Sequence, residues 1–308
     1  MSGEHASESE TPEATPQDVQ ELIGLLDLEV LDRDLFRARN PRQALRWRLF
    51  GGQVAAQAVR AASLTVDEDR GLHSLHGYFL RPGDPDRPTL LHVDRDRDGR
   101  SFTARHVVAR QGGDAIFTML ASFHTHEQGA EHQEVPMPDV PAPEDLEPGR
   151  LWSTGAMFDV RSVWNETNRR TFPGISNMFW ARTRAPIPDD PLMHECVLTY
   201  LSDVGSGFLK HPPDDPPLGG PSLDHAVWFH RPLRMDEWVL VDLEPVVASG
   251  GRAYYTGAVY DRDGHLLATI AQEHLRRLNP PDPRRAMEAA RRAADPAPAP
   301  APPPAPSG

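Results

Sequence analysis

The sequence predicts an α+β chain made of two similar halves, each with one helix packed on a curved antiparallel sheet. Three observations support this prediction. Similar motifs recur about 150 residues apart in the same order, hairpin turns separate strand-forming runs, and an amphipathic segment precedes strands in each half. Chance similarity would not preserve the order of several motifs, so an internal duplication explains the pattern.

The repeat is clearest around an Arg-Pro pair. Residues 79–82 (Phe-Leu-Arg-Pro) match residues 229–232 (Phe-His-Arg-Pro), an offset of 150. Two further matches follow in order, between residues 99–103 and 251–255 and between residues 109–117 and 260–267. The offset changes by only one or two residues, as expected of two copies of one architecture.

Each half contains one segment with helical periodicity. Residues 52–62 place apolar side chains at i, i+4 and i+7, and residues 191–202 place them at i, i+4 and i+8. Pro191 suits the first turn of a helix, where its missing N–H costs nothing. The apolar positions are Val54, Ala58 and Ala61 in the first helix and Met193, Val197 and Leu201 in the second.

Strands are expected after each helix. Residues 102–108 and 115–120 flank a Gln-Gly-Gly-Asp turn, and residues 253–259 and 266–271 flank a turn that ends in Asp-Gly. Gly-Asp and Asp-Gly between strand-like runs indicate hairpins. A third strand, 239–243, precedes this pair, so each half combines a helix with antiparallel strands.

Segments poor in large apolar side chains separate and flank the halves. Residues 1–20 are polar and acidic, and residues 279–308 end in a Pro/Ala run, so both are expected to be disordered tails. Residues 134–150 form a Pro-rich linker in this interpretation. The predicted organisation is therefore a tail (1–20), a first repeat (21–133), a linker (134–150), a second repeat (151–278) and a tail (279–308).

Composition excludes several classes of protein. The 32 basic and 45 acidic side chains give a net charge of −13, which disfavours a nucleic-acid partner. No apolar run approaches the ~20 residues of a membrane span, and the first residues lack the pattern of a secretory leader. Cys196 is the only cysteine, so no intramolecular disulfide can form. We therefore expect a cytoplasmic enzyme.

Four motifs resemble the acyl-CoA thioesterase II family. They are Leu-Phe-Gly-Gly-Gln-Val at 49–54, His-Ser-Leu-His-Gly-Tyr-Phe-Leu-Arg-Pro-Gly at 73–83, Ala-Ser-Phe at 121–123 and Asp-His-Ala-Val-Trp-Phe-His-Arg-Pro at 224–232. The resemblance covers roughly residues 20–278. It implies a double hotdog fold, in which each of two repeats wraps an antiparallel sheet around a helix.

The resemblance also implies an activity and its residues. The family hydrolyses acyl-CoA to a free acid and coenzyme A with an aspartate, a hydroxyl residue and a glutamine of the second repeat. These positions match Asp203, Ser222 and Gln272, and Ser222 departs from the threonine that is usual in the family. No cofactor is implied, because coenzyme A belongs to the substrate, and a homo-oligomer is expected by analogy.

These three residue types suit thioester hydrolysis. A carboxylate can take a proton from an attacking water, while a hydroxyl and an amide can orient that water. General-base catalysis is favoured, and covalent attack by Asp203 through an anhydride stays open. Each residue also has a structural alternative, since Asp203 could lie on the surface, Ser222 could stabilise a turn and Gln272 could be an ordinary polar strand residue.

The first half lacks two of the three groups. Leu72 corresponds to Ser222 and Ala121 to Gln272, which predicts one working site per chain. The histidines form no recognisable metal motif, and no Gly-x-Ser-x-Gly elbow occurs. An anionic substrate on an acidic chain needs local arginines, and Arg100, Arg231 and Arg252 are candidates.

Two other functions remain possible from the sequence. One is a hotdog enoyl-CoA hydratase or dehydratase, which would pair an acid with a histidine. The other is a non-catalytic acyl-CoA binding protein, in which Ser222 would mark a decayed site.

Overall fold

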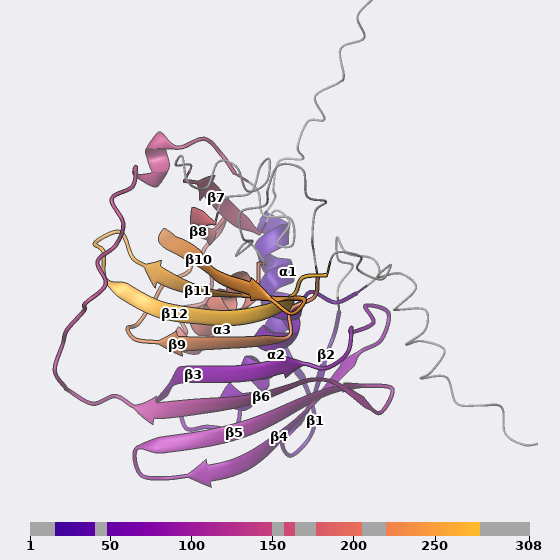
Figure 1. The fold of residues 1–308 in the computed structure, drawn as a ribbon. Helices are drawn as coiled ribbons and strands as arrows, with labels where there is room; N and C mark the ends of the chain where they lie inside the picture. Colours follow the sequence, from indigo (N-terminus) through magenta and orange to yellow (C-terminus); the bar gives the residue numbers. More distant parts are fainter. Residues whose placement is uncertain (1–15, 41–47, 150–156, 164–176, 205–219, 278–308) are drawn as a thin grey trace, which may run out of the picture.

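The computed structural model describes residues 16–40, 48–149, 157–163, 177–204 and 220–277, whose strands form one antiparallel sheet (Figure 1). The strands are β1 (Glu29–Asp32), β2 (Leu35–Ala38), β3 (Arg70–Phe79), β4 (Thr89–Asp98), β5 (Phe102–Gln111), β6 (Asp114–Thr125), β7 (Phe158–Ser162), β8 (Met178–Thr183), β9 (Asp224–Phe229), β10 (Val239–Ser249), β11 (Arg252–Tyr260) and β12 (Leu266–Leu275). Their order across the sheet is β1-β2-β4-β5-β6-β3-β9-β12-β11-β10-β8-β7.

The strand order is symmetric about the pair β3 and β9. Moving outward, β6, β5 and β4 on one side correspond to β12, β11 and β10 on the other. At the centre, His76 lies opposite Ala226, its own counterpart at the offset of 150. The repeats are therefore related by a local two-fold axis and share one continuous sheet, which confirms the double hotdog fold.

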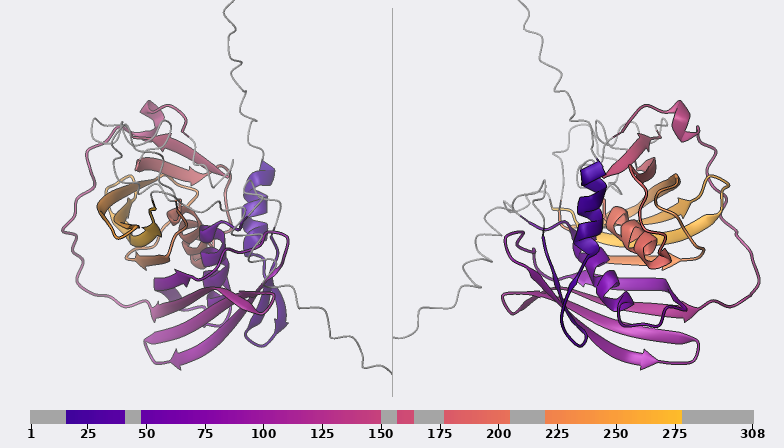
Figure 2. Two further views of the ribbon diagram at one scale, coloured as in Figure 1. Left: turned by 45° about the vertical axis from the view of Figure 1, so that its right-hand side comes forward. Right: turned by 180° about the vertical axis from the view of Figure 1, so that it is seen from behind.

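Two central helices lie side by side on the concave face of the sheet (Figure 2). They are α2 (Gly51–Ser63) and α3 (Pro191–Ser202), and the shorter helical elements are α1 (Pro16–Leu26) and the 3-10 turn η1 (Pro143–Asp145). Helix α3 begins at Pro191 as predicted, and the backbone N–H of Leu192 donates to the side chain of Asp190, which caps the helix. The other predicted helix, 52–62, is extended by one residue at each end.

Small side chains allow the two helices to approach closely. α2 is composed mainly of glycine, alanine and valine, and nearly all of it is buried. A Cβ at Gly52 would lie 2.3 Å from the carbonyl oxygen of Tyr200, so any larger residue would separate the helices. This contact places the beginning of α2 against the end of α3.

The structure corrects the predicted N-terminal boundary. Helix α1 begins at Pro16, so the prediction of disorder is wrong for residues 16–20. The buried side chains of α1, Val19, Leu22, Leu25 and Leu26, form an apolar face that crosses the predicted boundary. Residues 1–15 and the predicted tail 279–308 lie outside the described residues.

The predicted linker runs beside the sheet from the first half to the second (Figure 1). Residues 134–149 contain only the η1 turn and an isolated bridge between Pro148 and Arg161. Its role as a linker stays a prediction, and residue 150 lies outside the described residues.

Within the residues that the structure describes, no helix is long and apolar enough to cross a membrane.

Candidate active site

The candidate site lies where the end of α3 meets the beginning of α2. Asp203 directly follows the last residue of α3, and its side chain is only 5% exposed. Helix α3 therefore carries this carboxylate into the interior rather than to the surface. The structural alternative of an exposed surface aspartate is wrong.

The structure brings all three predicted site residues together. The Ser222 hydroxyl donates to Asp203 Oδ1 at 2.8 Å, and the Gln272 Nε2 amide donates to the same oxygen at 2.5 Å. The three residues come from the end of α3, the segment before β9 and strand β12. Because both neighbours donate, the carboxylate is the acceptor at the centre of the cluster.

Backbone bonds fix Ser222 in this arrangement. The segment 221–223 lies along β12, where Leu275 N donates to the Pro221 carbonyl and Leu223 N donates to the Glu273 carbonyl. Ser222 itself forms a bridge with His274. These contacts hold the hydroxyl in front of Asp203, although Ser222 lies outside a regular strand.

The first repeat closes the other side of the carboxylate. A Cβ at Gly51 would lie 2.4 Å from Asp203 Oδ2, so the first residue of α2 is in direct contact with that oxygen. The first turn of a helix has N–H groups without intrahelical acceptors and a partial positive charge. Asp203 thus lies between two donors of its own repeat and the helix N-terminus of the other.

Arg48, three residues before α2, adds a positive charge from the first repeat. Burial lowers the pKa of Arg48, and the negative charge of Asp203 opposes that shift. The guanidinium and the carboxylate therefore interact electrostatically. The sequence motif 49–54 lies next to this residue, but nothing in the motif itself pointed to Arg48.

Buried His225 contacts the end of α3 next to Asp203, a contact that the sequence patterns did not predict. Its Nε2 lies 2.7 Å from Ser202 Oγ, which in turn donates to the Thr199 carbonyl. Burial lowers the pKa of His225, against the opposing effects of Asp203, Asp224 and a hydrogen bond with Gln272. The ring is completely buried, so it packs against the cluster and has no contact with solvent.

Tyr255 was also missed. It lies opposite Gln272 on the neighbouring strand β11, and its hydroxyl donates to Gln272 Oε1. The alternation of buried residues along β11 could have indicated an inward side chain. Its partner could not be known without the strand register.

The matching positions of the first repeat hold different side chains. Leu72 lies opposite Phe123 as Ser222 lies opposite His274, and Ala121 lies opposite Arg105 as Gln272 lies opposite Tyr255. The registers therefore give the same correspondences as the sequence offsets. Arg105 thus corresponds to Tyr255. Its guanidinium donates to the Thr65 hydroxyl at 2.8 Å and to the Thr65 carbonyl at 2.9 Å.

The three arginines suggested for the coenzyme A phosphates either have partners within the fold or are exposed. Arg252 pairs with Glu273 at 2.7 Å, and Arg231 donates to the Leu266 carbonyl with Glu131 3.5 Å away. Arg100 is exposed on the first repeat. The apolar residues Met193, Val197, Leu201 and Phe229 belong to the main core, as does Cys196, whose thiol pKa is raised by burial.

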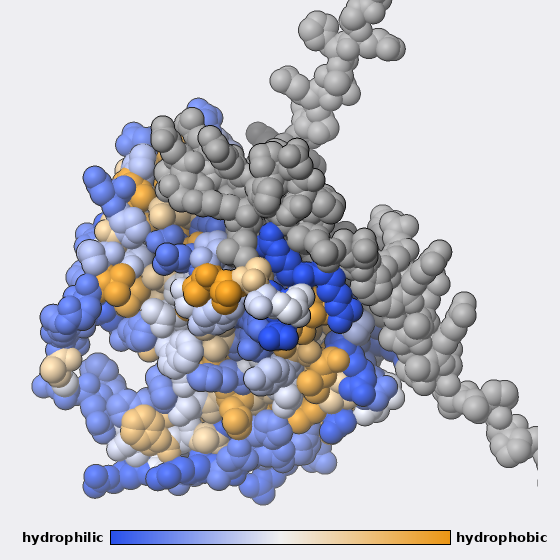
Figure 3. All heavy atoms as spheres, in the orientation of Figure 1, coloured by the Kyte–Doolittle hydropathy of each residue, from blue (hydrophilic) through white to orange (hydrophobic). Residues whose placement is uncertain are grey.

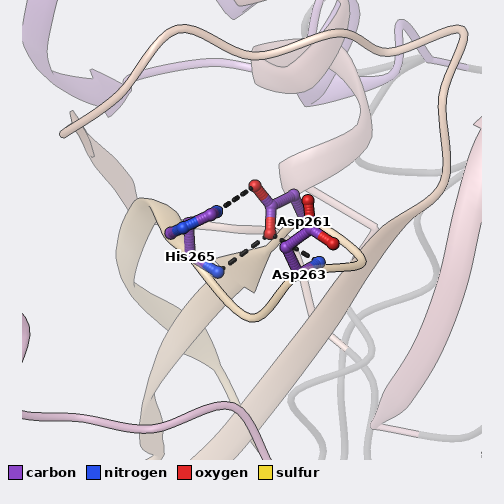
Figure 4. A group of neighbouring side chains, drawn as sticks. All are labelled: Asp261, Asp263 and His265. Carbon is purple, nitrogen blue, oxygen red and sulfur yellow. Dashed lines mark hydrogen bonds and ion pairs between the residues drawn. The ribbon is translucent and has the colours of Figure 1, made fainter.

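One group in the described residues has the composition of a metal site. Asp261, Asp263 and His265 lie together in the turn between β11 and β12 (Figure 4). Asp261 Oδ1 accepts the backbone N–H groups of Asp263 and His265, and Oδ2 lies 2.8 Å from His265 Nδ1. These bonds explain the cluster as the closure of a hairpin turn.

Comparisons with known proteins agree with the fold. Residues 39–124 match the acyl-CoA thioesterase N-terminal domain, and residues 133–275 match the acyl-CoA thioesterase C-terminal domain. Acyl-coenzyme A thioesterase 8 of Mus musculus is 39% identical, over 84% of this chain and 89% of that protein. Acyl-CoA thioesterase 2 of Haemophilus influenzae is 36% identical, over 84% and 97%.

A solved structure gives the same result. The acyl-CoA thioesterase II TesB2 from Mycobacterium marinum superposes with a TM-score of 0.72 at 43% identity, covering 82% of this chain and 97% of that one. Fold and matched domains together define a thioesterase of the double hotdog class. The chain belongs to the acyl-CoA thioesterase II family.

Proposed function

We propose that this chain hydrolyses acyl-CoA thioesters to a free carboxylic acid and coenzyme A, with Asp203, Ser222 and Gln272 as its catalytic residues. The observation that carries the proposal is the buried Asp203 carboxylate, which accepts hydrogen bonds from both other residues. The names of the relatives supply the substrate class.

In this mechanism Asp203 is the general base. Its Oδ1 is held by Ser222 and Gln272, so the carboxylate has a fixed orientation toward an attacking water. Because the Ser222 hydroxyl donates to Asp203, its oxygen lone pairs are available to accept from the same water. General-base catalysis requires only this water, whereas an anhydride would require a covalent bond between a carboxylate oxygen of Asp203 and the acyl carbon.

The beginning of α2 stabilises the developing negative charge. Gly51 is the first residue of α2 and contacts Asp203 Oδ2, which places the N-terminus of that helix next to the base. A helix N-terminus favours an anion by its exposed donors and its dipole. The departing thiolate is a good leaving group and needs no strong acid.

The two repeats have different tasks in this proposal. The second repeat (151–278) carries the three catalytic groups, while the first repeat (21–133) supplies Gly51 and Arg48. Leu72, Ala121 and Arg105 at the matching positions support a single site per chain. The linker assignment (134–150) and a cytoplasmic location complete the proposal.

The chain also associates with itself in this proposal. Tyr78 and Leu120 are 60% and 55% exposed, close to the local two-fold axis between His76 and Ala226. The face of the molecule that carries the sheet shows several apolar patches among polar residues (Figure 3). Apolar side chains on a sheet face support contact with a second copy.

A thiol-release assay over a panel of acyl-CoA chain lengths tests the function. We expect release by the wild-type chain and a loss of about 1,000-fold or more in kcat for Asp203→Asn, since removal of a general base and its charge costs several kcal/mol. Asp190→Asn, at the other end of α3, keeps a capping side chain and serves as the control.

The same assay separates the alternatives. Consumption of enoyl-CoA without thiol release would instead identify a hydratase. That reaction needs a histidine at the substrate, whereas His225 is completely buried and bonded to Ser202. Tight binding of acyl-CoA without turnover would identify a binding protein and contradict the proposal.

A further inference from the structure

We propose that Tyr255 is a positioning residue, which fixes the orientation of the Gln272 amide and through it the Asp203 carboxylate. This inference rests on the proposed function for its catalytic consequence. It assigns a role to a side chain that lies one step behind the three proposed catalytic groups.

The strand register places Tyr255 and Gln272 directly opposite each other on β11 and β12. Both side chains point to the buried face, and each is 1% exposed. The Tyr255 hydroxyl donates to Gln272 Oε1, while Gln272 Nε2 donates to Asp203 Oδ1 at 2.5 Å. The three groups form a chain of hydrogen bonds with one direction, from phenol to amide to carboxylate.

This direction matters because an amide can present either end. If the Gln272 amide were turned by half a rotation, its carbonyl oxygen would face the carboxylate oxygen, and neither atom could donate. A donor at the other end of the amide makes the productive orientation the only one in which all groups are satisfied. Tyr255 supplies such a donor to Gln272 Oε1, and buried His225 also has a hydrogen bond with Gln272.

The Tyr255 hydroxyl retains its proton throughout the working range of an enzyme. Burial raises the pKa of Tyr255 well above its usual value, and the nearby charges of Asp203 and Asp224 raise it further. A protonated phenol can donate to a carbonyl, whereas a phenolate could not. The same electrostatic effect shows that the ring lies close to the catalytic carboxylate.

The first repeat shows which contacts form at the position of Tyr255 when no glutamine lies opposite it. Arg105 occupies it, opposite Ala121, and donates instead to Thr65 just beyond the end of α2. In both repeats a buried donor on the corresponding strand, Arg105 on β5 or Tyr255 on β11, therefore points toward the end of a central helix, α2 or α3. Only in the second repeat does that donor meet an amide.

Tyr255→Phe removes only the hydroxyl and tests the proposal. We expect kcat to fall about 10-fold while KM stays within about twofold, because substrate contacts are unchanged and the base is less well oriented. Tyr254→Phe is the matched control, since Tyr254 lies next to it in β11 but opposite Glu273 on the other face. The control should keep wild-type kinetics.

A double-mutant cycle distinguishes positioning from a general structural effect. If Tyr255 acts through Gln272, Tyr255→Phe should change kcat less than about twofold in a Gln272→Ala background. An equal loss of kcat in both backgrounds would overturn the proposal. So would wild-type kcat in the single variant.

A readout without turnover separates this inference from the proposed function. The side-chain amide NMR signals of Gln272 are identified as those missing from Gln272→Ala. In Tyr255→Phe we expect them to shift and to exchange with solvent about 10-fold faster or more. Unchanged signals would refute the contact even in an active enzyme, whereas absent thioesterase activity with shifted signals would refute the proposed function alone.

Discussion

Ser222 presents the proposed catalytic hydroxyl on a side chain that lacks the methyl group of threonine. Its hydroxyl donates to Asp203 at 2.8 Å, but a serine has more freedom about χ1 than a β-branched residue. We expect Ser222→Thr to keep kcat or raise it by up to about threefold, because the rotamer is restricted. Ser222→Ala should lower kcat by about 10- to 100-fold by removing a bond to a charged group.

Steady-state kinetics on one acyl-CoA measures both Ser222 variants. Equal kcat for Ser222→Ala and wild type would mean that the hydroxyl is dispensable. A strong loss for Ser222→Thr would show that the methyl group does not fit beside His274, its bridge partner.

Individual residues differ in how far the sequence could predict them. Asp203, Ser222 and Gln272 were predicted as site residues because each matches a position of the family, and the structure brings them together. Tyr255 and His225 were missed because their importance arises from contacts across strands and between a strand and a helix. Such neighbours are fixed by the register, which no local pattern contains.

At the level of elements, sequence periodicity predicted the helix and strand features that depend on local interactions. Helix α3 begins and ends at the predicted residues, since its cap and its apolar face are both local. The strands around the turn at 111–114 continue further than predicted, because pairing with neighbours extends them. The pairing of β3 with β9 depends on the whole fold and could be inferred only from the duplication.

The contact between α2 and Asp203 yields a prediction for an element. At Gly51 a Cβ would lie 2.4 Å from Asp203 Oδ2, closer than atoms can approach, so Gly51→Ala must displace the carboxylate. We expect kcat to fall about 100-fold with an intact fold, measured by thiol release and circular dichroism. Gly24→Ala is the control, because that position in α1 has no atom within 4 Å of its Cβ.

Gly24→Ala should leave kcat unchanged and should not reduce stability, since alanine favours helix. Wild-type kcat in Gly51→Ala would show that the helix N-terminus does not contribute to the site. Loss of the folded circular dichroism spectrum would show that Gly51 serves helix packing instead.

At the scale of the whole molecule, the continuous sheet makes the repeats interdependent. The site of the second repeat is completed by Gly51 of the first, and Glu195 of α3 reaches the first repeat in return. Glu195 Oε2 accepts the backbone N–H of Leu72 at 3.3 Å on β3. The candidate site therefore includes contacts from both halves of the chain.

Glu195 predicts how the stability of the folded chain depends on pH. Burial raises the pKa of Glu195 from 4.5 to about 8, so between these values the folded state holds a proton that the unfolded state has released. The resulting stability is complete below pH 4.5 and is lost as the pH rises to about 8, by up to about 1.4 kcal/mol per pH unit. Glu195→Gln, a permanently neutral analogue, should therefore have a higher Tm than wild type at pH 8.

The difference in Tm should shrink toward pH 5, where wild-type Glu195 is protonated in the folded state. Glu68→Gln replaces an exposed carboxylate and should show the same Tm as wild type at both values. A Tm for Glu195→Gln that is equal to wild type at pH 8 would mean that Glu195 is charged in the folded chain. In that case the contact with Leu72 would be an ordinary charge-assisted bond, and the contact between α3 and β3 would not weaken with rising pH.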